Sequence, residues 1–458
     1  MKGIQILSKK RTKPPERVPA PAATGPVAVL RRYPVPLAIT LLVLAGALAG
    51  PAALADPATG GGVPASVSLK VGFGYVLLAP ILNVMDTLSL QTLGQHYAFL
   101  ISLILLYAGW RILRKRTARE LTRRAAIEAG VAVLALAGLL AFYGYGMVGP
   151  RPMAGLVVSD PGLLAVDMHS HTGASHDVRD SFTAESNRAW HEAAGFHAAY
   201  VSDHRTWDGA AAATQGNPSR AGQGVVLLPA VELKYKSYYA SILGDACRYW
   251  DAIEGNDLLP DPLHRDRAER PEPTLILTLP ETLEGVPEHD ADSLGFVAIE
   301  INDASPRGLR QSRRDRERIL YLADSLDLAL VAASNNHGWG RTAAAWTLVH
   351  LPDWRSLAPD RLGRAIEQKL HRDRRYATTV VERRMPYAGE SPLQLAATLP
   401  AMTWQMFGGI GARERASWLA WTWGLALLVG ALARGRASVP RPVRSAERRA
   451  VLESALES

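Results

Sequence analysis

At 458 residues, the chain is long enough for two or three domains and for at least one sizeable hydrophobic core. Its net charge of +8 is unevenly distributed, because residues 151–384 carry 27 basic and 33 acidic side chains, whereas the rest of the chain carries 24 and 10. A nucleic-acid-binding domain needs positive charge on the domain itself, so this distribution argues against a nucleic-acid partner. The single cysteine, Cys247, excludes an intrachain disulfide and a cysteine-cluster metal site.

Long apolar runs near both ends predict a membrane protein with the lipid bilayer as a partner. A basic cytoplasmic segment (1–33) is expected to precede a membrane region (34–150) with about three transmembrane helices, and one more helix (400–434) to precede a basic cytoplasmic tail (435–458). The apolar runs that carry these helices are 34–55, 97–110, 129–149 and 418–433.

The basic residues predict the orientation. Residues 114–124 contain six basic side chains, and further basic clusters precede the first span and follow the last. The positive-inside rule places all three clusters in the cytoplasm, and four spans satisfy it together. The globular stretch, residues 155–395, is then expected on the periplasmic or extracellular side of an inner or plasma membrane.

Two segments allow alternatives. Residues 71–90 are apolar but interrupted by Pro80 and Asp86, and a full span there would put 114–124 outside, so an interfacial or re-entrant helix is preferred. Residues 53–55 form an Ala-x-Ala cleavage pattern before Asp56, as at the end of a signal peptide. The long basic region and long apolar run before it favour a retained helix.

Short apolar runs alternate with helical patterns in the globular stretch. A helix is expected over 183–195, ending in Gly195, between the first two strands. This alternation predicts an α/β fold with mainly parallel strands. The seven predicted strands are 162–171, 197–204, 224–233, 237–245, 274–280, 296–302 and 328–337.

Metal-competent side chains collect at the C-terminal ends of these strands. This edge is where parallel α/β barrels assemble their sites. His169 and His171 are two residues apart, so they point to the same side of a strand. Imidazoles and carboxylates suit zinc, manganese or iron at a hydrolytic site. The residues concerned are His169, His171, His204, Glu232, Asn335 and His337.

Five motifs together resemble the polymerase and histidinol phosphatase (PHP) domain superfamily of metal-dependent phosphoesterases. They follow the family's order: DMHSHTGASHD (167–177), YVSDHRTW (200–207), LPAVEL (228–233), AIEIN (298–302) and ASNNHGWG (333–340). The resemblance implies a distorted seven-stranded βα barrel, here flanked by transmembrane helices. It also implies hydrolysis of a phosphorylated substrate by metal-activated water, with no side-chain nucleophile.

The resemblance also implies a ligand set. His169, His171 and Glu232 correspond to ligands of a first metal, and Glu232 can bridge to a second. Asn335 stands where the family has an aspartate, so its amide oxygen would bind without a charge. The expected ligands of another metal are His176, His204 and His337.

Two further family histidines are missing. Leu279-Pro280 replaces a His-Pro pair, and Ser241 or a neighbour replaces another histidine. This loss predicts two or fewer divalent ions (Zn, Mn or Fe), unless His289 or Asp290 substitutes from a nearby loop.

Four other residues lie within or next to the motifs. Arg205 and Arg341 could clamp a phosphate bidentately or form structural ion pairs. Asp203 is expected to orient His204, and Asp167 either acts similarly or caps its strand.

Two functions remain open. The first is a membrane-anchored phosphoesterase facing the periplasm or exterior, which the six retained ligands favour. The second is a catalytically impaired PHP-type module for ligand binding or signalling, which the missing histidines favour. A DNA-proofreading exonuclease is excluded by the predicted location and by the acidic charge of the domain.

Overall fold

The computed structural model of the chain describes residues 32–113, 118–235, 238–244, 274–279, 283, 295–384 and 391–438. It divides the chain into two compact units. One comprises Met1–Leu41 and Thr422–Ser458, and the other comprises Leu42–Trp421. The second unit contains the globular stretch with the candidate site, together with several apolar helices.

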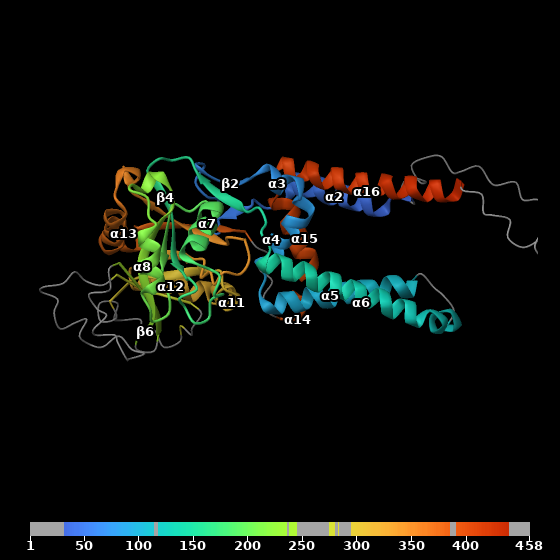
Figure 1. Cartoon of the computed structure of the whole chain (residues 1–458), viewed down its shortest axis with the longest axis horizontal. Coiled ribbons are helices and arrows are strands. Elements are labelled where there is room, and N and C mark those ends of the chain that lie inside the picture. Colours follow the sequence, from blue (N-terminus) through green and yellow to red (C-terminus); the bar gives the residue numbers. More distant parts are fainter. Residues whose placement is uncertain are drawn as a thin grey trace, which may run out of the picture. The chain divides into compact units, whose positions relative to one another are not determined.

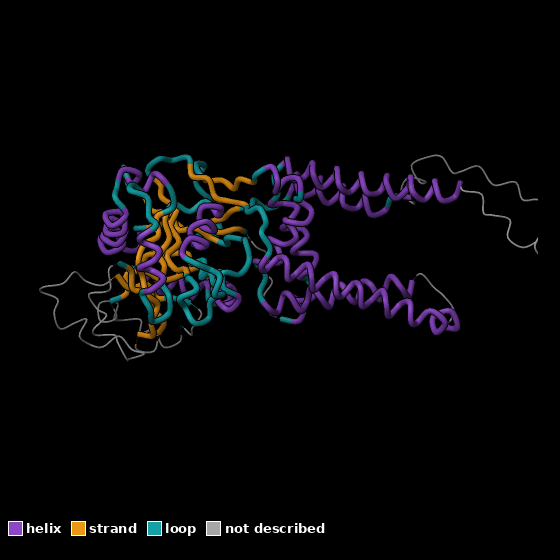
Figure 2. The backbone as a smooth tube through the Cα atoms, in the orientation of Figure 1, coloured by secondary structure: helices purple, strands orange, loops and turns teal. Residues whose placement is uncertain are grey.

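A ten-stranded sheet forms the core of the globular stretch (Figures 1 and 2). Its order is β1-β12-β11-β4-β5-β6-β7-β8-β9-β10, and strands β4 to β10 correspond to the seven that the sequence predicts. The strands are β1 (Leu54–Ala55), β4 (Leu163–Ser170), β5 (Ala198–Val201), β6 (Val226–Tyr235), β7 (Tyr238–Leu243), β8 (Thr274–Leu277), β9 (Phe296–Asp303), β10 (Ala329–Ala333), β11 (Ala345–His350) and β12 (Thr378–Arg383).

The pairing is mixed. Strands β4 to β6 are parallel to one another, as are β8 to β10, whereas β7 runs antiparallel to both of its neighbours. Strands β11 and β12 extend the sheet beyond β4 in antiparallel fashion. The sheet curls, so that the amide of Ala332 on β10 donates to the Thr347 hydroxyl on β11 over 2.8 Å.

The observed sheet confirms the α/β fold but not the expected barrel. A distorted seven-stranded barrel is expected from the resemblance, and the structure has a curled half-barrel of ten strands. The reason is that β11, β12 and the two-residue β1 add to the edge of β4, which a closed barrel would pair with another strand.

Helices cover the sheet, and α7 shows how the sequence fixes one of them. The side chain of Thr183 accepts a hydrogen bond from the Ser186 amide at its start, and Gly195 ends it in the left-handed conformation with φ of 83°. The expected helix over 183–195 is thus present. The covering helices are α7 (Ala184–Ala194), α8 (Asp208–Gln215), α11 (Pro306–Arg314), α12 (Arg316–Ser325) and α13 (Pro359–Asp373), with 3-10 turns η1 (Ala221–Gln223), η3 (Trp354–Ser356) and η4 (Arg374–Tyr376).

Within the described residues, three helices contain stretches that are long and apolar enough to cross a membrane, and these are Leu93–Trp110, Ala129–Val148 and Ala412–Arg434. They coincide with the second, third and fourth predicted spans. The helices outside the sheet domain are α2 (Pro34–Ala49), α3 (Phe73–Leu77), α4 (Ala79–Ser89), α5 (Leu93–Leu113), α6 (Ala118–Val148), α14 (Pro392–Ala396), α15 (Thr398–Gly409) and α16 (Ala412–Ser438).

The first predicted span, 34–55, is not one continuous helix. Helix α2 ends at Ala49, before Gly50 and Pro51, and its 16 residues span about 24 Å, less than the roughly 30 Å of a bilayer's hydrocarbon core. Leu54 and Ala55 instead form β1, pair with β12 and are buried. The Ala-x-Ala pattern therefore lies in a segment that belongs to the sheet.

The interrupted segment 71–90 forms two short helices, neither long enough to cross a bilayer. It follows strand β2 (Val67–Val71), which pairs with β3 (Ala154–Val158) in a separate two-stranded sheet. Asp86 on α4 is buried and forms ion pairs with Arg151 at 2.6 Å and Arg383 at 2.8 Å. The residue that interrupts the apolar run therefore anchors α4 to the globular stretch.

Candidate metal centre

The first group of metal-competent side chains gathers at the end of β4. His169 and His171 point to the same side, as predicted, and their Nε2 atoms lie 2.9 Å apart. Oε2 of Glu232, on β6, is 3.1 Å from Nε2 of His169 and 3.5 Å from Nε2 of His171. All three residues are buried. These three side chains could hold a metal ion.

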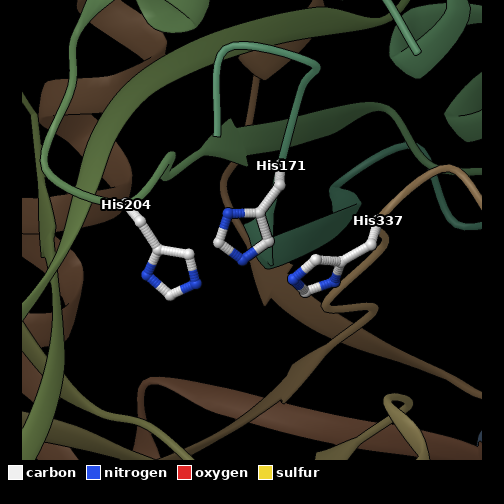
Figure 3. Close-up of side chains that lie close together, drawn as sticks. All are labelled: His171, His204 and His337. Atoms are coloured by element: carbon white, nitrogen blue, oxygen red, sulfur yellow. The ribbon is translucent and has the colours of Figure 1, made fainter. Parts of the chain in front are cut away.

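A second group shares His171 with the first. His171, His204 and His337 bring one ligand atom each within 4.8 Å of one another, and Figure 3 shows their rings around a common space. Nδ1 of His204 lies 3.2 Å from Oε2 of Glu232, which therefore touches both groups. Nδ1 of His337 donates to the carbonyl oxygen of Asn335 over 2.8 Å, so a neutral His337 has its lone pair on Nε2.

The donor atoms fit a divalent ion. Nδ1 of His169 faces Oε1 of Glu300 at 2.8 Å, so a neutral His169 presents the lone pair of Nε2 to His171 and Glu232. Nδ1 of His171 is buried and has no hydrogen-bond partner among the described residues. Neutral imidazole nitrogens beside a carboxylate are ligands that zinc, manganese and iron accept.

The carboxylates around His169 favour positive charge at that position. Burial lowers the pKa of His169, but the Glu232 and Glu300 carboxylates outweigh it and hold the pKa well above its usual value. Burial and the neighbouring His169 ring hold the pKa of His171 well below its usual value, so His171 is neutral at pH 7. Burial raises the pKa of Asp203 to about 6. The surroundings of His169 thus favour a cation beside a neutral His171.

Asn335 is positioned by a carboxylate that the sequence reasoning did not identify. Its Oδ1 is 3.1 Å from Nε2 of His171, and its Nδ2 donates to Oδ2 of Asp303 over 3.0 Å. Its backbone lies in the left-handed region with φ of 41°. The buried Asp303 ends β9 at the same sheet edge, so an aspartate in place of Asn335 would face a second carboxylate.

Two more acidic residues of the site were missed, although both lie inside the quoted motifs. Glu300 accepts from the amide of Leu279 over 2.7 Å as well as contacting His169, and it is fully buried. Oδ2 of Asp177 lies 3.4 Å from Nε2 of His204 and 3.2 Å from Nε2 of His337. Their place in strand-end motifs rich in metal-type residues was the signal that could have found them.

His176 lies outside the metal-competent groups, and the two expected orienting carboxylates, Asp203 and Asp167, contact residues other than His204. His176 is exposed, and its ring lies 5.3 Å from that of His204, outside both metal-competent groups. Asp203 was expected to orient His204, but it accepts from the amide and hydroxyl of Thr172 and lies 3.9 Å from Nδ1 of His171. It therefore fixes the chain that follows His171.

Asp167 acts as an orienting residue between three elements. Its Oδ2 lies 2.7 Å from Nε2 of His191 on α7, and its Oδ1 accepts from the amide of Ser334, which follows β10. These bonds tie α7 and the segment leading to Asn335 to the end of β4.

Leu279 and Ser241, which the resemblance places at or near two expected histidine positions, offer no imidazole. Leu279 is fully buried and uses its amide on Glu300. Ser241 pairs in register with Glu232, and its buried hydroxyl has no partner among the described residues. Pro280, His289 and Asp290 lie outside the described residues.

A cavity of about 700 Å³ lies beside the site. Of the two arginines predicted to bind phosphate, only one lines it. Arg205 lines it, beside His204, and so does Arg307, which the sequence reasoning did not single out. Arg341 does not line it and donates from Nε to the carbonyl oxygen of Arg151 over 2.7 Å.

No family model and no curated protein matches this chain. Among solved structures, PsfC from Pseudomonas syringae is similar at 17% identity, with 53% of this chain and 98% of that chain covered and a TM-score of 0.36. A two-domain protein from Bacteroides vulgatus, described as containing a predicted PHP-like metal-dependent phosphoesterase, is similar at 15% identity, with 48% and 64% covered and a TM-score of 0.32. An amidohydrolase from Chromobacterium violaceum is similar at 14% identity, with 42% and 98% covered and a TM-score of 0.26. At this level of similarity the neighbours carry no conclusion about the activity of this chain.

Proposed function

We propose that the chain is a membrane-anchored, metal-dependent phosphoesterase whose globular stretch faces the periplasm or cell exterior. The observation that carries this proposal is the pair of metal-competent groups that share His171 and border a cavity with two arginines. A hydrolytic site needs metal ligands, access for a substrate and positive charge for a phosphate, and these residues supply all three.

His169, His171 and Glu232 would hold one ion, and His204 and His337, which Glu232 also contacts through His204, would hold a second. The chemistry that divalent ions would supply there is Lewis-acid polarisation of the phosphate and a lower pKa of a water molecule. Two ions or fewer are expected, because Leu279 and Ser241 offer no imidazole.

The chain's own residues orient the ligands and the substrate. Glu300 holds the ring of His169 through Nδ1, and Asp303 holds the amide of Asn335. Arg205 and Arg307, which line the cavity, are placed to neutralise the negative charge of a phosphate.

The alternative is a PHP-type module that binds a ligand without hydrolysing it. The replacement of two family histidines by Leu279 and Ser241 is the observation that favours it. On this alternative the domain still binds a divalent ion and a phosphorylated ligand, but it releases no phosphate.

Metal analysis of the purified full-length chain, followed by a screen of phosphoesters with added manganese, zinc or iron, separates the two functions. His171→Ala should remove metal and activity without unfolding the protein, because His171 belongs to both groups. His350→Ala, an exchange of an exposed histidine at the end of β11, is the control and should change neither. A folded, metal-poor His171→Ala protein with full activity would refute the site.

Orientation is tested separately with reporters fused near residue 390. A phosphatase reporter, which needs the periplasm or exterior, should be active there, and a fluorescent reporter that needs the cytoplasm should be dark. The reverse pattern would refute the proposed orientation and leave the metal site untouched.

A further inference from the structure

The cavity beside the candidate metal centre is lined by residues of two chemical kinds. The polar lining residues, named here the polar wall, include His204, Glu232 and His337 together with Arg205 and Arg307. The apolar lining residues, named here the apolar wall, include Met147, Trp190, Leu233, Pro306 and Trp339. A ligand that fills the whole cavity therefore needs a charged part and an apolar part.

The apolar wall begins where a candidate membrane span ends. Met147 belongs to the last turn of α6, whose apolar stretch Ala129–Val148 has no buried residue. Met147 is 50% exposed and Trp339 is 48% exposed. Large apolar side chains at the end of a span, with a tryptophan among them, are typical of the membrane–water interface.

Hydrogen bonds fix this wall to the metal centre. The amide of Gly340 donates to the carbonyl oxygen of Met147 over 2.7 Å, and the indole of Trp190 donates to the carbonyl oxygen of Gly340 over 3.2 Å. Gly340 and Trp339 belong to the same loop as Asn335 and His337. The loop that supplies metal-competent residues is therefore bonded directly to the end of the span.

Resting on the proposed function, we infer that the substrate is amphiphilic: a phosphate ester of a long apolar chain, reached from the surface of the membrane. The phosphate lies against the polar wall at Arg205 and Arg307. The chain runs along Met147 and Trp339 toward the bilayer. A small water-soluble phosphate ester shares the phosphate chemistry but leaves the apolar wall uncovered, so chain length distinguishes the two.

The test measures binding of butyl phosphate and decyl phosphate to the full-length chain in lipid nanodiscs with Mn²⁺, by calorimetry, with empty nanodiscs to subtract partitioning. Burial of one methylene strengthens binding about fourfold, so three buried methylenes among the six added give roughly sixtyfold. Decyl phosphate should therefore bind at least about sixtyfold more tightly. Phosphate release from both esters is measured in parallel.

Trp339→Ala should reduce the decyl-to-butyl ratio at least fivefold. Trp404→Ala is the matched control, because Trp404 on α15 is 39% exposed and does not line the cavity, and it should leave the ratio unchanged. Equal binding of the two esters, no binding of either, or an equal loss of the ratio in both variants would overturn the inference.

The two proposals fail differently. A chain-length preference that depends on Trp339, with no phosphate released from any ester, would support the amphiphilic ligand and refute the phosphoesterase. Release of phosphate from butyl and decyl phosphate with equal efficiency would support the phosphoesterase and refute the amphiphilic substrate.

Discussion

Glu300→Gln should weaken divalent-ion binding, although Glu300 belongs to neither metal-competent group. The carboxylate is fully buried, with one oxygen 2.8 Å from Nδ1 of His169 and the other accepting from the amide of Leu279 over 2.7 Å. Glutamine has the same shape but only one acceptor oxygen. If that oxygen faces His169, the NH₂ group meets the N–H of Leu279, and donor faces donor.

The opposite amide orientation harms the site more directly. The NH₂ group would then face Nδ1 of His169, which has to act as an acceptor and so moves its proton to Nε2. Nε2 is the atom that lies 2.9 Å from His171 and 3.1 Å from Glu232, so the lone pair needed for an ion is lost. The first orientation leaves a buried donor unsatisfied, and the second removes the lone pair that an ion needs.

The two amide orientations have free-energy effects of similar size. An unsatisfied buried donor carries a free-energy penalty of about 1–3 kcal/mol. Loss of a residue that orients a metal-binding histidine costs about 10- to 100-fold in metal affinity, which corresponds to roughly 1.4–2.7 kcal/mol. The apparent Kd for Mn²⁺ or Zn²⁺ should therefore rise by about one to two orders of magnitude.

The assay is a competition titration of the full-length protein against a chelating metal indicator at constant pH. Glu382→Gln is the matched control, because the Glu382 carboxylate accepts from Arg316 and Asn302 and contacts no histidine of the site. A change of less than twofold for Glu300→Gln in a folded protein, or an equal change in the control, would refute the reasoning.

Three further predictions follow from buried polar groups. Burial lowers the pKa of His197 from its usual 6.5 to about 4, so stability should fall as pH drops through this window, by roughly 2 kcal/mol at pH 5. His197→Asn keeps an acceptor for the Ala165 amide, and its thermal midpoint should change less between pH 7 and pH 5 than that of the wild type. An equal change in both proteins would contradict this. Asp86→Asn leaves two arginines without their carboxylate and should cost about 3–5 kcal/mol, seen as a lower thermal midpoint than wild type. Asn335→Asp alone should increase metal affinity little, because the new carboxylate would face that of Asp303. The double variant Asn335→Asp with Asp303→Asn should bind metal more tightly than either single variant. Equal metal affinities of the three variants would argue against this pairing.

Local patterns in the sequence predicted much of the fold. Seven apolar runs became β4 to β10, because short β-rich runs between turn residues signal strands wherever they lie in the chain. Thr183 and Gly195 placed the ends of α7 for equally local reasons. His169 and His171 were predicted to share one side of a strand, and the alternation of side chains along a strand is enough to establish that.

Other features were decided only by contacts between residues far apart in sequence. Nothing near Glu300 shows that it will meet His169, which lies 131 positions earlier, or that Asp303 will receive the amide of Asn335. The apolar run 34–55 predicted one helix. In the structure the helix ends before Gly50 and Pro51, and Leu54 and Ala55 instead pair with β12 as strand β1. Composition and periodicity describe what a segment can form by itself. The partner of a buried carboxylate, the edge at which a strand joins a sheet and the wall of a cavity depend on which distant segments are brought together, and only the tertiary structure decides that.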